Sequence, residues 1–128
     1  KSTPAIGLAM GVERLALLLD VAATLPDSIA RQVDAYLIPV GDVGIKVLEL
    51  GQMIRRSCPA LRLQNHCGGG SLKNQMKKAD KSGAIVALIV GEDEVAEGNL
   101  TVKFLREDRP QMSVSVDELI ELLNIKIN

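Results

Sequence analysis

Aromatic residues are nearly absent from this sequence. Tyr36 and Phe104 are its only Tyr and Phe, and it has no Trp among 128 residues. We therefore expect a core of aliphatic side chains, mainly Val, Ile, Leu and Ala. An RNA-binding sheet that stacks several bases on paired aromatic rings is excluded, because that mode needs more rings than the chain contains.

Cysteine and histidine are also scarce. Cys58, Cys67 and the single histidine, His66, do not have the spacing of a zinc motif. The sequence therefore predicts no metal site. Two unpaired thiols are typical of a reducing compartment, so we expect a cytoplasmic protein.

Long apolar runs are missing too. No stretch reaches the length of about 18 residues that a membrane-spanning helix needs, so no membrane partner is expected. The start, KSTPAIGLAMG, has no signal-peptide pattern and does not begin with Met, and we expect the chain to be a piece of a longer protein. With 47% hydrophobic residues and a formal net charge of −1, the composition is that of an ordinary globular domain.

The chain begins with a pattern of one strand and one helix. Residues 4–10 are small and apolar and predict a strand, and residues 12–23 carry leucines at helical spacing and predict a helix. Pro26 and Asp27 end this helix. The expected parts of the chain are residues 1–24, a linker over 25–33 and a domain over 34–128.

The domain from residue 34 alternates strands and helices. Short apolar or alternating runs predict five strands, over 34–40, 61–65, 84–90, 99–107 and 111–116. Helical spacing predicts three helices, between Asp42 and Pro59, over 72–82 and over 116–123. The first three strands pair in parallel through crossovers, and the last two form an antiparallel hairpin. The expected fold class is α/β, a mixed five-stranded sheet with three helices.

Polar residues at the starts of these helices predict caps. Asp42 precedes the first helix and Ser71 the second. Ser115 and Glu118 have the spacing of a capping box for the third. Such side chains bond the backbone N–H groups that the first helical turn leaves free.

The stretch HCGGGSLKNQMKKADKSG, residues 66–83, joins three glycines to a helix with four lysines. The arc expected to face the core contains Leu72, Met76, Ala79 and Gly83. The exposed stripe contains Lys73, Lys77 and Lys81, with Lys78 further round. Because Gly68, Gly69 and Gly70 lead into a helix N-terminus beside these cations, the stretch suits a phosphate anion.

A simpler interpretation of the lysines stays open. Lysines opposite an apolar face are more commonly just solvated, and spacing alone favours that interpretation. GGGSLK also lacks the G-x-x-x-x-G-K-[ST] spacing of a nucleotide P-loop, and no G-x-G-x-x-G occurs. The glycines by themselves therefore indicate no nucleotide site.

Two further stretches carry a family resemblance. PAIGLAMGVERLALLL, residues 4–19, resembles the third signature motif of class II aminoacyl-tRNA synthetases, in the form found in the histidyl-tRNA synthetase family. NHCGGGSLKNQMKKADKSGA, residues 65–84, is similar to the C-terminal anticodon-binding domain of the same family, and GEDEVAEGNLTVKFL, residues 91–105, to related class II domains. The resemblance covers nearly the whole chain, with its anchors in the family's order.

The resemblance implies that the chain is the C-terminal piece of a histidine–tRNA ligase. Such enzymes are homodimers that use ATP and Mg²⁺ to make histidyl-adenylate and then transfer histidine to tRNA-His; no DNA or membrane partner is implied. Arg14 matches the motif arginine that contacts the ATP phosphates, for which a planar, permanently charged guanidinium is suited. Gly7 and Gly11 match the motif glycines that let adenine approach the backbone. Without the motif, the preferred interpretation of Arg14 is a surface arginine on an amphipathic helix.

The same resemblance assigns tRNA contacts. Glu94 and Lys103 align with positions that touch anticodon bases in related domains, and unpaired RNA bases are read by such edge contacts. Lys73, Lys77 and the glycines at 68–70 are expected to contact backbone phosphates instead. The simpler alternative for Glu94 and Lys103 is a loop acid and a solvated lysine.

The chain departs from the family pattern in several places. Cys67 stands where a glycine is expected, and Asn74 where a lysine is common. The first two class II motifs and the histidine-binding segments are missing, and Arg14 alone cannot hold ATP. We therefore expect the isolated chain to be inactive as a ligase and to hold no cofactor. A non-catalytic regulatory synthetase paralogue and a general α/β interaction domain remain the alternative functions.

Overall fold

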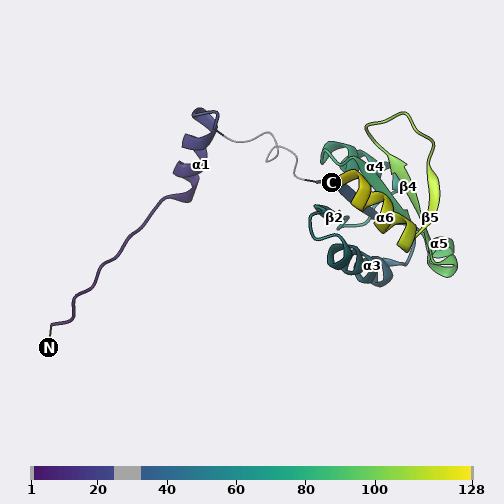
Figure 1. Cartoon of the computed structure of the whole chain (residues 1–128), viewed down its shortest axis with the longest axis horizontal. Coiled ribbons are helices and arrows are strands. Elements are labelled where there is room, and N and C mark those ends of the chain that lie inside the picture. The colour runs from purple at the N-terminus through teal and green to yellow at the C-terminus, as the bar shows by residue number, and fades with distance from the viewer. Residues whose placement is uncertain (1, 25–32, 128) are drawn as a thin grey trace. The chain divides into compact units, whose positions relative to one another are not determined.

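The computed structural model describes residues 2–24 and 33–127 (Figure 1). It divides the chain into two compact units, Lys1–Ala30 and Arg31–Asn128. Most of the linker expected over 25–33 lies outside the described residues. No helix in the described part of the chain is long and apolar enough to cross a membrane.

The first unit has one regular element within residues 2–24, helix α1 (Val12–Val21), which confirms the predicted helix. None of the side chains of α1 is buried. The strand predicted over 4–10 is wrong, because residues 2–11 have no regular secondary structure. A strand is held by hydrogen bonds to a partner strand, and residues 2–24 contain no strand with which this segment pairs.

The second unit contains all the strands predicted for it. Within residues 33–127 it has five strands, β1 (Ala35–Pro39), β2 (Leu63–Asn65), β3 (Val86–Val90), β4 (Asn99–Phe104) and β5 (Met112–Ser115). The same residues form four helices, α3 (Gly44–Ser57), α4 (Leu72–Lys81), α5 (Glu92–Glu97) and α6 (Val116–Ile127). The predicted count of three helices is therefore one short, since α5 is absent from it.

The five strands form one mixed sheet in the order β2-β1-β3-β4-β5. β1 pairs in parallel with β2 and with β3. β4 runs antiparallel to both β3 and β5. The predicted α/β class, the parallel crossovers and the final hairpin are thus confirmed.

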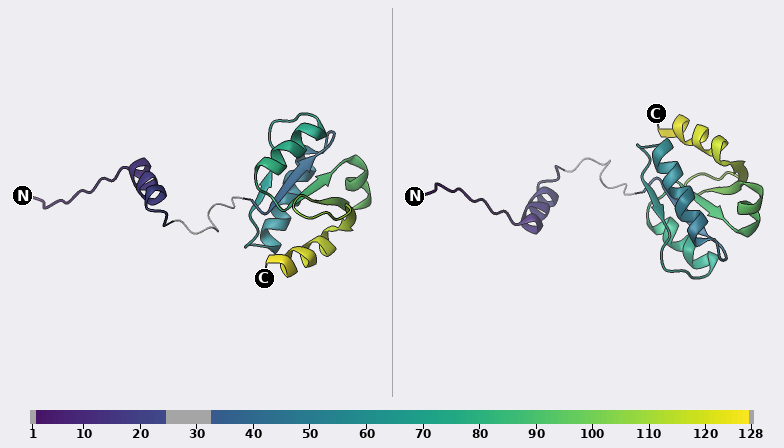
Figure 2. Two further views of the ribbon diagram at one scale, coloured as in Figure 1. Left: turned by 90° about the horizontal axis from the view of Figure 1, so that it is seen from above. Right: turned by 90° about the horizontal axis from the view of Figure 1, so that it is seen from below.

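One face of the sheet, the closed face, is apolar from β1 to β5 and packs against α3 and α6. Its buried cluster includes Leu37, Val47, Ile54, Leu88, Leu100, Val102, Val114, Leu119 and Leu123. In Figure 2, α6 (yellow) and α3 lie on the same side of the sheet, and α4 lies on the opposite side. The aliphatic core expected from the composition is mainly this layer.

The other face, the open face, is apolar only where α4 covers it. Its buried cluster includes Tyr36, Ile38 and Ala87 of the sheet and Ala79 of α4. Along β4 this face continues with Thr101 and Lys103, and Lys103 is exposed. The predicted alternation along β4 explains this, because successive side chains point to opposite faces of a sheet.

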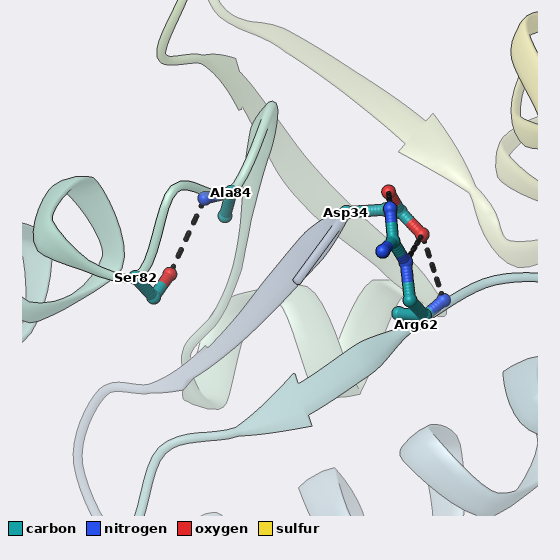
Figure 3. A network of polar contacts seen from close by, with 4 residues as sticks. All are labelled: Asp34, Arg62, Ser82 and Ala84. Carbon is teal, nitrogen blue, oxygen red and sulfur yellow. Dashed lines mark hydrogen bonds and ion pairs between the residues drawn. The ribbon is translucent and has the colours of Figure 1, made fainter. Parts of the chain in front are cut away.

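Polar contacts fix the ends of the strands and helices (Figure 3). The Asp34 carboxylate, just before β1, accepts hydrogen bonds from Arg62 Nε at 3.0 Å and from the Arg62 backbone N–H at 2.9 Å. Arg62 Nη2 lies 2.7 Å from Asp34 Oδ1, so the segments that lead into β1 and β2 are tied together. In the turn between α4 and β3, Ser82 Oγ accepts from the Ala84 N–H at 3.3 Å.

Two of the three predicted caps are present. Ser71 Oγ accepts from the Asn74 N–H at 3.4 Å at the start of α4. At the start of α6, Glu118 Oε2 accepts from the Ser115 N–H at 2.8 Å, and Ser115 Oγ accepts from the Glu118 N–H at 3.3 Å. The capping box over these residues is therefore confirmed.

The cap predicted at Asp42 is wrong. The N-cap of α3 is Val43, whose side chain makes no capping hydrogen bond. Asp42 lies one residue too early for its carboxylate to reach the free N–H groups of that turn. Its own N–H donates to Glu92 Oε1 at 3.4 Å, which joins the loop after β1 to α5.

Helix α5 is marked by a capping bond at its start and a glycine at its end, and not by a periodic pattern of apolar residues. The Gly91 N–H donates to Glu94 Oε2 at 3.0 Å at its start. It ends at Gly98, whose φ of 72° is left-handed, a conformation that glycine adopts readily. Because this helix is a short, mostly acidic segment, it has no apolar stripe from which to predict it.

Candidate functional site

The loop between β2 and α4 is shaped by three consecutive glycines. Gly68, Gly69 and Gly70 have φ angles of 101°, 63° and 102°, in the region that residues with a side chain rarely adopt. A Cβ at any of these positions would meet no atom within 4 Å. Glycine is therefore required by the backbone conformation and not by crowding. These residues are the triglycine loop.

The triglycine loop lies at the carboxyl edge of the parallel strands. It follows β2, as Gly41 follows β1 and Gly91 follows β3. From β1 the chain passes through α3 to β2, which lies on one side of β1. It then passes through α4 to β3, which lies on the other side of β1, so the strand order reverses beside β1. Ligands of open α/β sheets bind outside the carboxyl ends of strands at such a reversal.

His66 connects the triglycine loop to the sheet. It is buried, with 7% of its surface exposed. Nε2 lies 2.9 Å from Gly69 O, and Nδ1 lies 3.1 Å from the Tyr36 hydroxyl. Because a carbonyl oxygen only accepts, Nε2 donates to Gly69 O, and in the neutral ring Nδ1 accepts from the Tyr36 hydroxyl. Burial raises the pKa of Tyr36, which keeps that hydroxyl protonated.

Gln75 of α4 holds the next residue of the loop. It is 4% exposed. Its Nε2 donates to Gly70 O at 2.9 Å and to Pro39 O, at the end of β1, at 3.0 Å. Its Oε1 is buried and has no hydrogen-bond partner among the described residues.

The core arc predicted for α4 is wrong at both ends. Leu72 and Gly83 are not buried and Met76 is half-buried, whereas Ala79 is buried as predicted. Gln75 faces the sheet instead, because its amide satisfies two backbone carbonyls that an apolar side chain would leave unbonded. Apolar spacing on a helical wheel does not anticipate a polar residue in that role.

Four exposed lysines give α4 an uncompensated positive surface. They are Lys73, Lys77, Lys78 and Lys81, and none forms an ion pair with a described residue. The one acidic residue of the helix, Asp80, is paired with Arg106 Nη1 at 2.8 Å. The predicted lysine stripe is therefore present, and it begins directly after the triglycine loop.

Glu94 of α5 contacts β4, and Lys103 belongs to β4, on the open face. Glu94 is half-buried, and its Oε1 accepts from Thr101 Oγ1 at 3.2 Å. Lys103 is exposed and pairs with Ala87, near the amino end of β3. Glu94 is thus at the same edge as the triglycine loop, whereas Lys103 lies further along the sheet.

Three of the candidate residues belong to the first unit. Gly7, Gly11 and Arg14 are all exposed. Gly7 and Gly11 precede α1, and Arg14 lies in its first turn. Within the described residues of both units, no cluster of three or more His, Cys, Asp or Glu side chains is arranged to hold a metal ion.

A family model described as an anticodon binding domain matches residues 34–125. The match includes the sheet, the triglycine loop and α4. The chain belongs to the anticodon binding domain family. Class II aminoacyl-tRNA synthetases carry this domain, so the coarser part of the sequence resemblance is confirmed.

Solved synthetases share the fold of this anticodon-binding domain. Histidyl-tRNA synthetase from Nostoc sp. PCC 7120 matches 93% of the chain with a TM-score of 0.70 and 23% identity, and apo S. aureus histidyl-tRNA synthetase matches 87% with 0.65 and 24%. The RNA binding domain of threonyl-tRNA synthetase from Cryptosporidium parvum Iowa II matches 89% with 0.68 and 15%. The chain spans 28% of the length of each of these three structures.

Two residues that hold the triglycine loop, His66 and Gln75, were not predicted from the sequence to do so. The sequence pattern marks His66 only as a residue without zinc spacing, and it does not mark Gln75 at all. The available signals are a histidine just before a glycine run and an amide on the core-facing side of a helix. Neither signal predicts a role by itself, because the role depends on loop carbonyls that turn toward these two side chains only in the folded structure.

Proposed function

We propose that this anticodon-binding domain binds the anticodon region of tRNA-His as part of a cytoplasmic histidine–tRNA ligase. The observation that supports this proposal most is the family match over residues 34–125. The matched region contains a glycine-rich loop beside a row of lysines that form no ion pair with a described residue. Histidine is favoured by the resemblance of residues 4–19 to the histidyl form of the third class II motif. The parent enzyme would be a homodimer that uses ATP and Mg²⁺.

The lysines and the triglycine loop are assigned to the RNA backbone. Lys73 and Lys77 extend from one side of α4, and neither is held by a carboxylate of the described residues. Such ammonium groups attract phosphates without reading sequence. The N-terminus of α4 adds free backbone N–H groups and a partial positive charge at the same place.

Glu94 and Lys103 are assigned to bases. Each carboxylate oxygen of Glu94 accepts one hydrogen bond within the chain, from Gly91 or from Thr101. A carboxylate oxygen has two acceptor sites, so each retains one for the amino or imino group of a base. Lys103, exposed on a strand, can donate to base oxygens or nitrogens.

The residues assigned to ATP do not by themselves form a binding site. Arg14 supplies one guanidinium for a phosphate, and Gly7 and Gly11 leave room beside the backbone. All residues described between 2 and 24 are exposed, so none of these residues encloses a nucleotide. We therefore propose that adenylate formation belongs to the longer parent protein. The isolated chain should show no histidine-dependent exchange of pyrophosphate into ATP, and measurable exchange would overturn that assignment.

Binding to two tRNAs at two salt concentrations tests the proposed function. The chain is titrated into labelled tRNA-His and into a non-cognate tRNA. We expect tighter binding to tRNA-His, weakening with salt by a logarithmic slope of about 0.7 for each phosphate contacted on unpaired RNA. Equal, weak binding to both tRNAs would favour a general interaction domain whose lysines are only solvated.

A further inference from the structure

Two buried polar side chains hold consecutive carbonyl groups of the triglycine loop. His66 Nε2 bonds to Gly69 O at 2.9 Å, and Gln75 Nε2 bonds to Gly70 O at 2.9 Å. The two side chains come from opposite ends of the loop, one before it and one from the first turns of α4. Each is also tied to β1, His66 through the Tyr36 hydroxyl and Gln75 through Pro39 O.

These bonds set the direction of the loop's N–H groups. In a trans peptide the N–H points opposite to the C=O of the same unit. With the carbonyls of Gly69 and Gly70 turned toward buried side chains, the N–H groups of Gly70 and Ser71 point away from them. Neither N–H has an acceptor among the described residues. They stand beside Lys73 at the start of α4.

Three glycines in a row do not maintain such a conformation by themselves. Glycine populates positive and negative φ about equally, so a free triglycine loop would sample many arrangements. The φ angles of 101°, 63° and 102° are one of these, and the two side-chain bonds select it. Ordering the loop before the ligand arrives lowers the entropy cost of binding.

The Oε1 of Gln75 is buried and has no hydrogen-bond partner among the described residues. A buried acceptor without a partner costs free energy, whereas an apolar side chain of similar size would leave the carbonyls of Pro39 and Gly70 without this donor. The glutamine supplies two N–H groups that reach the ends of β1 and of the loop at once, so it joins the loop to the sheet.

We propose that His66 and Gln75 are positioning residues that hold the triglycine loop ready for RNA. They contact no RNA themselves; they fix the outward N–H groups of Gly70 and Ser71, and Tyr36 orients His66. This inference rests on the proposed function, because it assigns the loop a role in tRNA binding.

A matched pair of substitutions at position 66 tests whether the bond from His66 to Gly69 O positions the triglycine loop. In His66→Gln the amide reaches about as far as Nε2 and retains the donor for Gly69 O. In His66→Asn the shorter amide reaches only the region of Nδ1, so it retains the contact with Tyr36 and no longer bonds to Gly69. Affinity for a labelled anticodon stem-loop of tRNA-His is measured for both variants, together with their unfolding by urea.

We expect His66→Asn to bind the stem-loop about tenfold more weakly than the natural chain, whereas His66→Gln stays within about threefold. Gln75→Met, which removes both amide bonds at similar volume, should also weaken binding about tenfold, and it should lower stability because the carbonyls of Pro39 and Gly70 lose this donor. A control, Ile54→Val in the core of the closed face, should lower stability and leave affinity unchanged. The amide resonances of Gly68–Gly70 should lose their dispersion in His66→Asn and retain it in the control.

The outcomes separate this inference from the proposed function. If the natural chain shows no salt-dependent affinity for the stem-loop, the proposed function is wrong and the inference falls with it. If the natural chain binds but His66→Asn and Gln75→Met bind equally well, only the positioning role is wrong. Losses of affinity that follow stability in every variant, Ile54→Val included, would make the two residues merely structural.

Discussion

The closed and open faces of the sheet differ in how far their apolar side chains extend. On the closed face, buried side chains continue from Leu37 of β1 to Val114 of β5 under α3 and α6. On the open face they end near β3 under α4, and β4 continues with Thr101 and Lys103. Packing is thus concentrated on one side of a single sheet, and the other side is left with charged groups in contact with water.

The division follows from the cost of desolvating charge. A lysine or carboxylate that is buried without a partner loses several kcal/mol of hydration, so an RNA-facing group must remain at the surface until RNA covers it. A sheet that already buries one complete face can leave part of the other exposed. Substitutions on the closed face should therefore change stability, and those on the open face should change RNA affinity.

The largest expected effect is on the closed face. Leu88→Ala removes a fully buried side chain from β3 and should lower the free energy of unfolding by about 2–5 kcal/mol. Urea unfolding measures the loss, and the folded fraction should retain its affinity for tRNA. Leu122→Ala on α6, where the side chain is 37% exposed, is the control and should cost clearly less. Equal losses of stability at Leu88 and Leu122 would show that burial on the closed face does not determine the effect.

The next effect is on the open face. Lys73→Ala combined with Lys77→Ala should weaken tRNA binding and reduce the salt slope by about 0.7 for each phosphate that the protein no longer neutralises. Stability should stay within about 0.5 kcal/mol of the natural chain, because both side chains are exposed. Lys46→Ala, which removes an exposed lysine of α3 paired with Glu49, is the matched control. An equal fall in affinity from this control would show that net charge, not position, attracts RNA.

Glu94→Gln tests a residue of the open face that also makes hydrogen bonds within the protein, so it should change both stability and RNA binding. The substitution keeps the shape and removes the charge that accepts from the Gly91 N–H and from Thr101 Oγ1. We expect a loss of about 1 kcal/mol in stability together with a smaller preference for tRNA-His over a non-cognate tRNA. Thr101→Val separates the two effects, because it removes one of the bonds and leaves the carboxylate. An unchanged tRNA preference in Glu94→Gln would remove Glu94 from base reading.

The smallest effect depends on pH and belongs to α6. Hydrogen bonds from the Ser115 backbone and hydroxyl lower the pKa of Glu118 below its ordinary value of 4.5. A depressed carboxyl pKa adds stability above the pKa of the unfolded chain, and that stability is lost as the pH falls through the folded pKa. Urea unfolding should therefore separate the natural chain from Glu118→Gln at pH 7, with the difference shrinking in acid. A difference that is independent of pH would argue against the capping bond, and tRNA affinity should not change.

Much of the fold was predictable because local patterns and burial agree in the second unit. AIVALIV, residues 84–90, is apolar without a break and becomes a central strand buried on both faces. Ser71, Ser115 and Glu118 cap their helices where the spacing places them. The lysine stripe of α4 was equally visible, since exposed positions follow directly from the helical period.

The tertiary structure alone decided the features that depend on a partner distant in the sequence. Residues 4–10 read as a strand, but a strand requires a hydrogen-bonded neighbour, and the described residues 2–24 provide none. Gln75 displaces Leu72 from the core side of α4 because Pro39 O and Gly70 O, brought there by β1 and the triglycine loop, need donors. The sequence determined which segments prefer helix or strand, because those preferences are local. The backbone groups left without partners, and the buried side chains that satisfy them, were decided only when the chain had folded.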